Sequence, residues 1–235
     1  MNSFIKNKIK LLPFFLGRKQ RTAKSGIFRG LRMKLDLRCQ TQLYLGLFER
    51  EVYKWVKRLC AGINTAVDIG AGEGEYTLYF LAKTGAKKVF AFEPLAECRA
   101  RLMSNLRLNN LADEHRLKLS SKYVGSSNNE SMCTLDLLLP SISPPCFIKI
   151  DAEYNEVDIL KGSPKLLDLP QINWLIETHS KQLERQCVEI FSRLGYSTVI
   201  VHHAWWRLFI PEMRKSSHNR WMVAVRNAGI EMNLF

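Results

Sequence analysis

Short runs of apolar residues alternate, from about residue 65 onward, with stretches in which apolar residues recur every three or four positions. The short runs are typical of buried strands, and the longer spacing is typical of helices that bury one face. Their alternation predicts a parallel sheet whose strands are joined by helices. We expect strands at 66–69, 88–92, 117–121, 147–150 and 174–177, and helices at 76–83, 96–108, 157–167 and 182–194.

The last part of the chain shows a different pattern. Two more apolar runs, at 196–202 and 221–225, are separated by a turn-rich stretch, which predicts an antiparallel hairpin at one edge of the sheet. The predicted fold class is therefore α/β, a doubly wound and mostly parallel sheet with a C-terminal antiparallel hairpin. In such a sheet a ligand is expected at the carboxyl ends of the strands.

The first sixty residues precede this pattern and form an N-terminal basic appendage. Alternating apolar residues predict a pair of strands within 27–42, and apolar residues at helical spacing predict a helix at 49–59. Residues 1–26 mix basic and apolar side chains and are interrupted by Pro13, which indicates a short amphipathic segment. We therefore divide the chain into an appendage, 1–60, and a main domain, 61–235.

The net charge of +13 resides almost entirely in this appendage. Residues 1–60 hold 15 lysines and arginines against three acids, and residues 1–38 hold 11 against Asp36 alone. Such a block attracts phosphates, anionic lipids or acidic glycans, or it is a solvated cover with no specific partner. Because the main domain is nearly neutral, nucleic acid is disfavoured as a partner. The interleaved apolar side chains favour a weak contact of residues 1–38 with an anionic membrane.

Composition narrows the class of protein. With 46% hydrophobic and 24% charged residues, the 235-residue chain can bury a substantial core. Its six cysteines form no Cys-x-x-Cys pair, so neither a zinc cluster nor a redox pair is indicated. No stretch approaches the roughly 18 apolar residues that span a bilayer. We expect a cytoplasmic protein, with a peripheral membrane contact as the open alternative.

The motif that says most about a ligand is Val67-Asp-Ile-Gly-Ala-Gly-Glu-Gly-Glu-Tyr76, at the end of the first predicted strand. Glycines at 70, 72 and 74 let the backbone turn tightly and leave room for a ligand against bare peptide. Asp68 would repel a pyrophosphate, but it can accept hydrogen bonds from an ammonium group. The motif therefore favours a cofactor whose amino-acid end lies over the loop.

Glu93 and Pro94 end the second predicted strand, about 20 residues beyond the glycines. An acidic residue at this place in a doubly wound fold accepts hydrogen bonds from ribose hydroxyls. A ribose acceptor together with an amino-acid acceptor describes S-adenosyl-L-methionine better than a nicotinamide cofactor.

Seven segments that follow one another over residues 45–200 resemble FkbM-type S-adenosylmethionine-dependent methyltransferases. They are Leu45-Gly-Leu-Phe-Glu49, Val67-Asp-Ile-Gly-Ala-Gly-Glu-Gly-Glu-Tyr-Thr-Leu78, Val89-Phe-Ala-Phe-Glu-Pro94, Asn105 with Leu108-Asn109, Thr134-Leu-Asp-Leu-Leu138, Phe147-Ile-Lys-Ile-Asp-Ala-Glu153 with Glu156 and Leu160-Lys-Gly162, and Leu175-Ile-Glu-Thr-His179. The resemblance implies a Rossmann-like methyltransferase that usually acts on hydroxyl groups of sugars or other small metabolites. The residues expected to bind the cofactor are Asp68, Gly70, Gly72, Gly74, Glu93, Pro94, Ser121 and Asp151.

Methyl transfer to an alcohol needs a group that removes the hydroxyl proton. Asp151, Glu153, Glu177 and His179 lie at or just beyond the ends of neighbouring predicted strands. His179 is the natural base, because the ordinary histidine pKa of about 6.5 leaves it mostly neutral at pH 7. Asp151 suits the role of base, acceptor anchor or cofactor contact, and Glu153 is the third expected catalytic residue. The same side chains would also suit Mg²⁺ or Mn²⁺, although we expect no metal site.

Tyr154 departs from the family pattern Asp-x-Glu-Gly-x-Glu, which here is Asp151-Ala-Glu-Tyr-Asn-Glu156. A bulky side chain at this loop would either reshape the acceptor pocket or occlude it. The predicted function is O-methylation of a sugar or another small hydroxyl-bearing metabolite. An RNA methyltransferase and a catalytically silent protein that binds cofactor or glycan are the alternatives.

Overall fold

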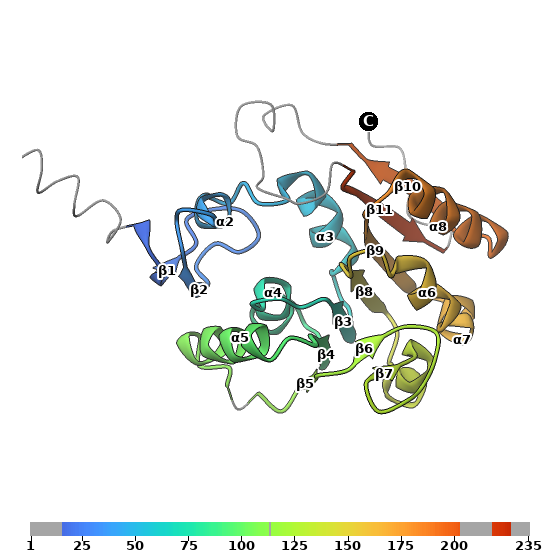
Figure 1. Cartoon of the computed structure of the whole chain (residues 1–235), viewed down its shortest axis with the longest axis horizontal. Coiled ribbons are helices and arrows are strands. Elements are labelled where there is room, and N and C mark those ends of the chain that lie inside the picture. Colours follow the sequence, from blue (N-terminus) through green and yellow to red (C-terminus); the bar gives the residue numbers. More distant parts are fainter. Residues whose placement is uncertain (1–15, 113, 203–217, 227–235) are drawn as a thin grey trace, which may run out of the picture.

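The computed structural model describes residues 16–112, 114–202 and 218–226. A seven-stranded sheet in the order β10-β11-β9-β8-β3-β4-β5 forms its centre (Figure 1). The five parallel strands are β3 (Thr65–Ile69), β4 (Lys88–Phe92), β5 (Leu117–Ser120), β8 (Cys146–Ile150) and β9 (Ile172–Thr178). At one edge β11 (Arg220–Val225) runs antiparallel to both β9 and β10 (Ser197–Val201). The predicted fold class, with its C-terminal hairpin, is confirmed.

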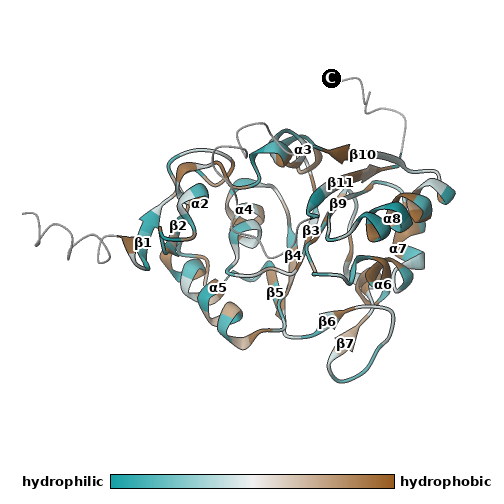
Figure 2. Cartoon of the chain, turned by 45° about the horizontal axis from the view of Figure 1, so that its top comes forward, coloured by the Kyte–Doolittle hydropathy of each residue, from teal (hydrophilic) through white to brown (hydrophobic). Residues whose placement is uncertain are grey.

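Helices cover both faces of the sheet. Successive side chains of a strand point to opposite sides, so that a strand of apolar residues needs cover on each face. Ala66 of β3 joins a core cluster with Leu78 of α4 and Leu102 of α5. Val67, its neighbour, joins a second cluster with Ile159 of α6 and other residues of the opposite helical layer. The layers consist of α4 (Glu75–Lys83) and α5 (Ala96–Leu108) on one face, and α6 (Glu156–Lys161), α7 (Pro164–Asp168) and α8 (Lys181–Arg193) on the other. Figure 2 shows α8 with both hydrophobic and hydrophilic residues, as expected of a helix that covers a sheet.

The single helix predicted at 157–167 is wrong, because the chain forms α6 and α7 there. Gly162 and Ser163 separate the two helices, and Pro164 is the first residue of α7. Proline lacks the N–H that a continuous helix needs, but it fits a first helical turn. The break also lets Gly162 lie close to residue 125, since a Cβ at Gly162 would be only 2.0 Å from the carbonyl oxygen of Gly125.

The N-terminal strand pair lies earlier than predicted. Its strands are β1 (Lys19–Thr22) and β2 (Arg32–Leu35), and the pair predicted within 27–42 is therefore wrong in its bounds. Asp36 ends the second strand by accepting a hydrogen bond from the backbone N–H of Arg38, and the chain then turns into a helix. The remaining elements before residue 60 are α2 (Thr41–Leu45), the 3-10 helix η1 (Arg50–Val52) and α3 (Tyr53–Leu59).

Residues before position 60 share the hydrophobic core of the main domain. Phe28, Met33 and Leu35 are buried in the same cluster as Phe80 of α4 and Phe147 of β8. The ring of Phe28 meets that of Tyr76 edge to face, with centroids 5.4 Å apart. The described part of the appendage is thus packed against the sheet, whereas residues 1–15, which carry most of the expected amphipathic segment, lie outside the described residues.

Between β5 and β8 the chain forms a small lobe. The short strands β6 (Tyr123–Val124) and β7 (Met132–Cys133) pair in parallel, and the 3-10 helix η2 (Leu135–Ser141) follows them. No helix among the described residues has the length and apolar character that crossing a membrane requires.

Candidate functional site

A cavity of about 660 Å³ lies at the carboxyl ends of β3, β4 and β8, where the fold predicts a ligand. Five of the residues predicted for the site line it, namely Gly70, Glu93, Pro94, Asp151 and Glu153. The others lie around it or beneath it. Ser121 is exposed and is not among the residues that line the cavity.

The three glycines of the motif have different surroundings. A Cβ at Gly70 would lie 1.9 Å from the carbonyl oxygen of Asp151, and one at Gly74 would lie 2.7 Å from Cγ of Leu102. Gly72, in contrast, has a φ of +55°, and the nearest atom to its Cβ position is 3.8 Å away. Glycine is therefore required at 70 and 74 by packing, whereas a Cβ at Gly72 would meet Oε2 of Glu75 only at ordinary van der Waals distance.

Glu93 holds the glycine loop at the end of β4. It is 5% exposed, and its two carboxylate oxygens accept hydrogen bonds from the backbone N–H groups of Gly72, at 2.8 Å, and Leu95, at 2.9 Å. A carboxylate offers about four lone-pair sites. Glu93 can therefore accept ribose hydroxyls while it holds the loop in place.

Asp68 does not line the cavity, because it is fully buried beneath the loop. Its oxygens accept hydrogen bonds from the hydroxyl of Thr77, at 2.7 Å, and from Nζ of Lys149, at 3.2 Å. In this arrangement Asp68 anchors the base of the loop, and its expected contact with an ammonium group of the cofactor stays a prediction.

Lys149 is a residue that the sequence reasoning missed. Its Nζ donates to the carbonyl oxygen of Gly70 at 3.2 Å and lies 3.6 Å from Oδ2 of Asp151. Burial lowers the pKa of Lys149, but the charges of Asp68 and Asp151 outweigh it and raise the pKa above its ordinary value. The side chain thus stays an ammonium that links the glycine loop to the end of β8. A single lysine in the apolar run Phe147-Ile-Lys-Ile150 was the available signal.

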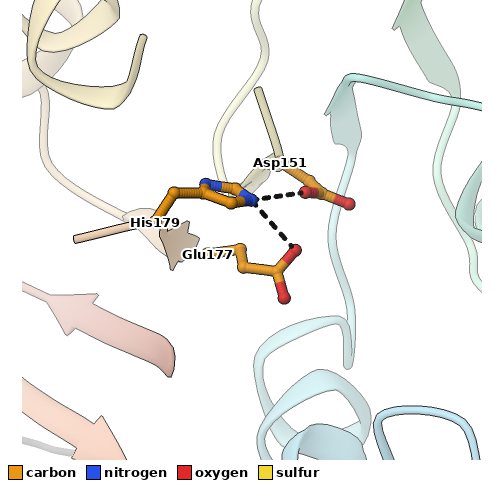
Figure 3. Close-up of side chains that lie close together, drawn as sticks. All are labelled: Asp151, Glu177 and His179. Atoms are coloured by element: carbon orange, nitrogen blue, oxygen red, sulfur yellow. Dashed lines mark ion pairs between the residues drawn. The ribbon is translucent and has the colours of Figure 1, made fainter. Parts of the chain in front are cut away.

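Asp151, Glu177 and His179 come together from the ends of β8 and β9 (Figure 3). Nε2 of His179 lies 3.9 Å from Oδ1 of Asp151 and 3.8 Å from Oε2 of Glu177. On the other side of the ring, Nδ1 lies 2.5 Å from Oε1 of Glu156, which also accepts the backbone N–H of His179. Because an ionised carboxylate only accepts, Nδ1 carries the proton and Nε2 is the basic atom of the neutral ring.

The carboxylates around His179 change its pKa. Burial lowers the pKa of the imidazole, but the hydrogen bond that it donates to Glu156 and the charges of Asp151, Glu156 and Glu153 outweigh this effect, so that the pKa is raised above 6.5. The histidine is itself only 6% exposed, and Asp151 is the member of the cluster that lines the cavity. The group can therefore take up a proton that arrives at Asp151 or at Nε2.

The same three residues offer donor atoms within 4.8 Å of one another, a set that would also suit a divalent cation. Lys149 already brings a positive charge to within 3.6 Å of Asp151, which opposes a cation there. The expected absence of a metal site stays a prediction.

Comparisons with known proteins support the resemblance. Residues 125–230 match the model of the methyltransferase FkbM domain. The structure is similar to methyltransferase FkbM from Methylobacillus flagellatus, with a TM-score of 0.55 and 20% identity over 70% of this chain and 44% of that chain. It is also similar to ribosomal protein L11 methylase from Lactobacillus delbrueckii, with a TM-score of 0.51 and 12% identity over 76% of this chain and 78% of that one. A search of curated proteins found no match.

These likenesses show the fold, and the matched residues 125–230 include the elements from β7 to β11. The chain spans less than half the length of the FkbM protein of Methylobacillus flagellatus. S-adenosylmethionine, the cofactor that the domain implies, suits the acceptor oxygens of Glu93, which lines the cavity and holds the glycine loop. Over residues 125–230 the chain is therefore similar to the methyltransferase FkbM domain, a likeness that implies S-adenosylmethionine as the cofactor.

Proposed function

We propose that the protein is an S-adenosylmethionine-dependent methyltransferase that acts on a hydroxyl group of a sugar or of another small metabolite. The observation that carries the proposal is the His179–Glu156 pair, which lies beside Asp151 at the rim of the cavity. An alcohol must lose its proton during transfer, and a histidine held by a carboxylate is a group that can accept it.

The cofactor, when bound, supplies a methyl group on a sulfonium, which needs no further activation. The protein must then position the acceptor and accept its proton. Asp151 is placed to accept a hydrogen bond from the acceptor hydroxyl, and Nε2 of His179 takes the proton. Glu156 stabilises the imidazolium that results, and Glu153 adds negative charge at the same rim of the cavity. Lys149 fixes the position of Asp151 relative to the glycine loop.

Cofactor binding is tested first, by calorimetry with S-adenosylmethionine and S-adenosylhomocysteine. We expect affinity in the micromolar range. Gly72→Val should abolish binding, because a branched side chain at a φ of +55° would strain the glycine loop and occupy ligand space. Glu93→Ala should weaken binding by about tenfold to a few hundredfold, as for lost charged hydrogen bonds. Tight binding of NAD with no S-adenosyl ligand would refute the cofactor assignment.

The acceptor class is tested with labelled cofactor and cell fractions divided into polysaccharide, lipid, RNA and small metabolites. We expect label in the polysaccharide or small-metabolite fraction. His179→Ala should lower turnover by about 10²–10⁴-fold while cofactor affinity stays within about twofold of wild type. Label confined to RNA would replace the proposal with a nucleic-acid methyltransferase, and cofactor binding without transfer to any fraction would favour a silent relative.

A further inference from the structure

Tyr154 has a backbone conformation that tyrosine rarely adopts. Its φ is +64°, in the left-handed region, which costs a bulky residue free energy and favours glycine. The glycine of the family pattern at this position is thus explained by backbone geometry. A side chain retained in a strained conformation beside a site indicates a role for that side chain.

The fold gains little from the tyrosine ring. The residue is 60% exposed, so its burial adds little to the core. It lies in the loop between β8 and α6 and lines the cavity together with Asp151 and Glu153. Its ring centroid lies 5.7 Å from that of His179, at an interplanar angle of 48°. The ring therefore forms an exposed wall directly beside the group that we propose as the base.

The surroundings of this wall indicate what can bind against it. An aromatic face attracts a flat apolar surface, and the carboxylates of Asp151 and Glu153 accept hydrogen bonds from hydroxyls. A saturated ring that carries several hydroxyls offers both, with C–H groups on its face and O–H groups at its rim. A phenol would match the ring but would leave most of these carboxylate oxygens without donors.

We infer that Tyr154 is a specificity-determining residue, the platform on which a polyhydroxylated ring of the pyranose class stacks so that one hydroxyl lies beside Asp151 and His179. This inference rests on the proposed function and narrows its acceptor class. A tyrosine in place of glycine at this loop thus adds an acceptor wall and does not occlude the site.

The test measures binding, so that it does not depend on knowing the natural acceptor. Saturation-transfer NMR is recorded with methyl pyranosides of glucose, galactose, mannose and rhamnose, in the presence of S-adenosylhomocysteine. Sorbitol serves as the acyclic control and catechol as the aromatic one. The proteins are the wild type, Tyr154→Phe, Tyr154→Gly and Gln171→Gly. Gln171 is the matched control, because it is exposed, has a φ of +59° and precedes β9 at the opposite end of the sheet.

We expect the wild type to bind at least one pyranoside more tightly than sorbitol, with an upfield shift of the C–H protons on one face of the sugar. Tyr154→Phe should bind within about twofold of wild type, and Tyr154→Gly roughly tenfold more weakly. Gln171→Gly should bind like wild type. Neither glycine variant should melt below wild type, because each removes a positive-φ side chain.

The inference is overturned if no pyranoside binds better than sorbitol, if catechol alone binds, or if Tyr154→Gly binds pyranosides as well as wild type does. Calorimetry with S-adenosylhomocysteine on the same four proteins should give equal affinities. If the wild type does not bind S-adenosylhomocysteine, the cofactor assignment is contradicted instead. Failure of the inference about Tyr154 and failure of the proposed function are therefore distinguishable.

Discussion

At the scale of single residues, the proposed catalysis depends on the contact between His179 and Glu156. As a base, His179 must be neutral, so the rate should rise with pH through its pKa, which the surrounding carboxylates raise above 6.5. Glu156→Gln removes the largest of these favourable contributions. We therefore expect its pH–rate profile to be displaced to lower pH, together with a lower maximal rate because the imidazolium is less stabilised.

The control for this experiment is Glu189→Gln, which removes an exposed carboxylate of α8 that pairs with Arg193. Its profile should coincide with that of wild type. An unchanged midpoint in Glu156→Gln would assign the titrating group to another residue, with Asp151 and Glu153 as the next to examine.

Substitution of Asp151, together with removal of metal ions, distinguishes base catalysis from metal catalysis. Asp151→Asn keeps the shape of the side chain but removes its charge, and turnover should fall roughly 10²-fold. Dialysis of the wild type against EDTA should leave turnover unchanged, because in the proposed mechanism His179 accepts the proton and Lys149 provides a fixed positive charge beside Asp151. A loss of activity that Mn²⁺ or Mg²⁺ restores would assign the cluster of Asp151, Glu177 and His179 to a cation.

The sequence predicted which residues gather at the site, but it did not predict the contacts that these residues make. Strand ends in a parallel sheet lie at one edge, so the proximity of Asp151 and His179 follows from the order of the strands. The burial of Asp68 does not follow from that order, because it depends on Lys149, whose side chain crosses from the neighbouring strand. The positive φ of Tyr154 is likewise a property of the folded loop and is not visible in the residue type.

At the scale of elements, the N-terminal segment contacts the loop that carries the glycines. Arg18 donates two hydrogen bonds to Glu73, at 2.7 and 2.8 Å, and Arg101 of α5 donates a third at 2.9 Å. Glu73 lies between Gly72 and Gly74, so these arginines restrain the loop from outside the sheet. Restraint of a loop in its binding conformation reduces the entropy that a ligand must remove.

Arg18→Ala should therefore weaken S-adenosylhomocysteine binding about two- to tenfold, as measured by calorimetry, with little change in melting temperature. Arg193→Ala is the control, since it breaks an exposed ion pair with Glu189 that is far along α8. Equal affinities in both variants would show that the loop holds its shape without Arg18.

Elements with strong apolar patterns were predicted to within one or two residues, as β4 and α5 show. The errors fall where a turn decides the structure. The strand pair before residue 36 was placed too late, because Ile27 and Phe28 lie in the turn that joins β1 to β2, and yet they are buried like strand residues. Burial of a turn against α4 is a tertiary effect that local periodicity does not report.

At the scale of the whole molecule, the basic N-terminus combines a structural part with a segment that we propose as a membrane contact. Residues 16–60 are packed into the core, as Phe28 and Met33 show. Residues 1–15 carry three lysines and the apolar side chains Phe4, Ile5, Ile9, Phe14 and Phe15. This composition suits a peripheral contact with an anionic surface, in which apolar side chains enter the interface and lysines lie over the headgroups.

Two truncations distinguish these parts. A variant that lacks residues 2–15 should keep the affinity of the full chain for S-adenosylhomocysteine, because the described core is intact. It should sediment much less with phosphatidylserine-containing vesicles, whereas the full chain should bind at low salt and be released near about 0.5 M salt, where surface charges are screened within a few ångströms. A variant that lacks residues 2–42 should be insoluble or lose cofactor binding, since it removes β1, β2 and the buried residues between them. If the full chain ignores the vesicles at low salt, the membrane proposal is wrong, and the basic N-terminus serves the fold and the restraint of the glycine loop by Arg18.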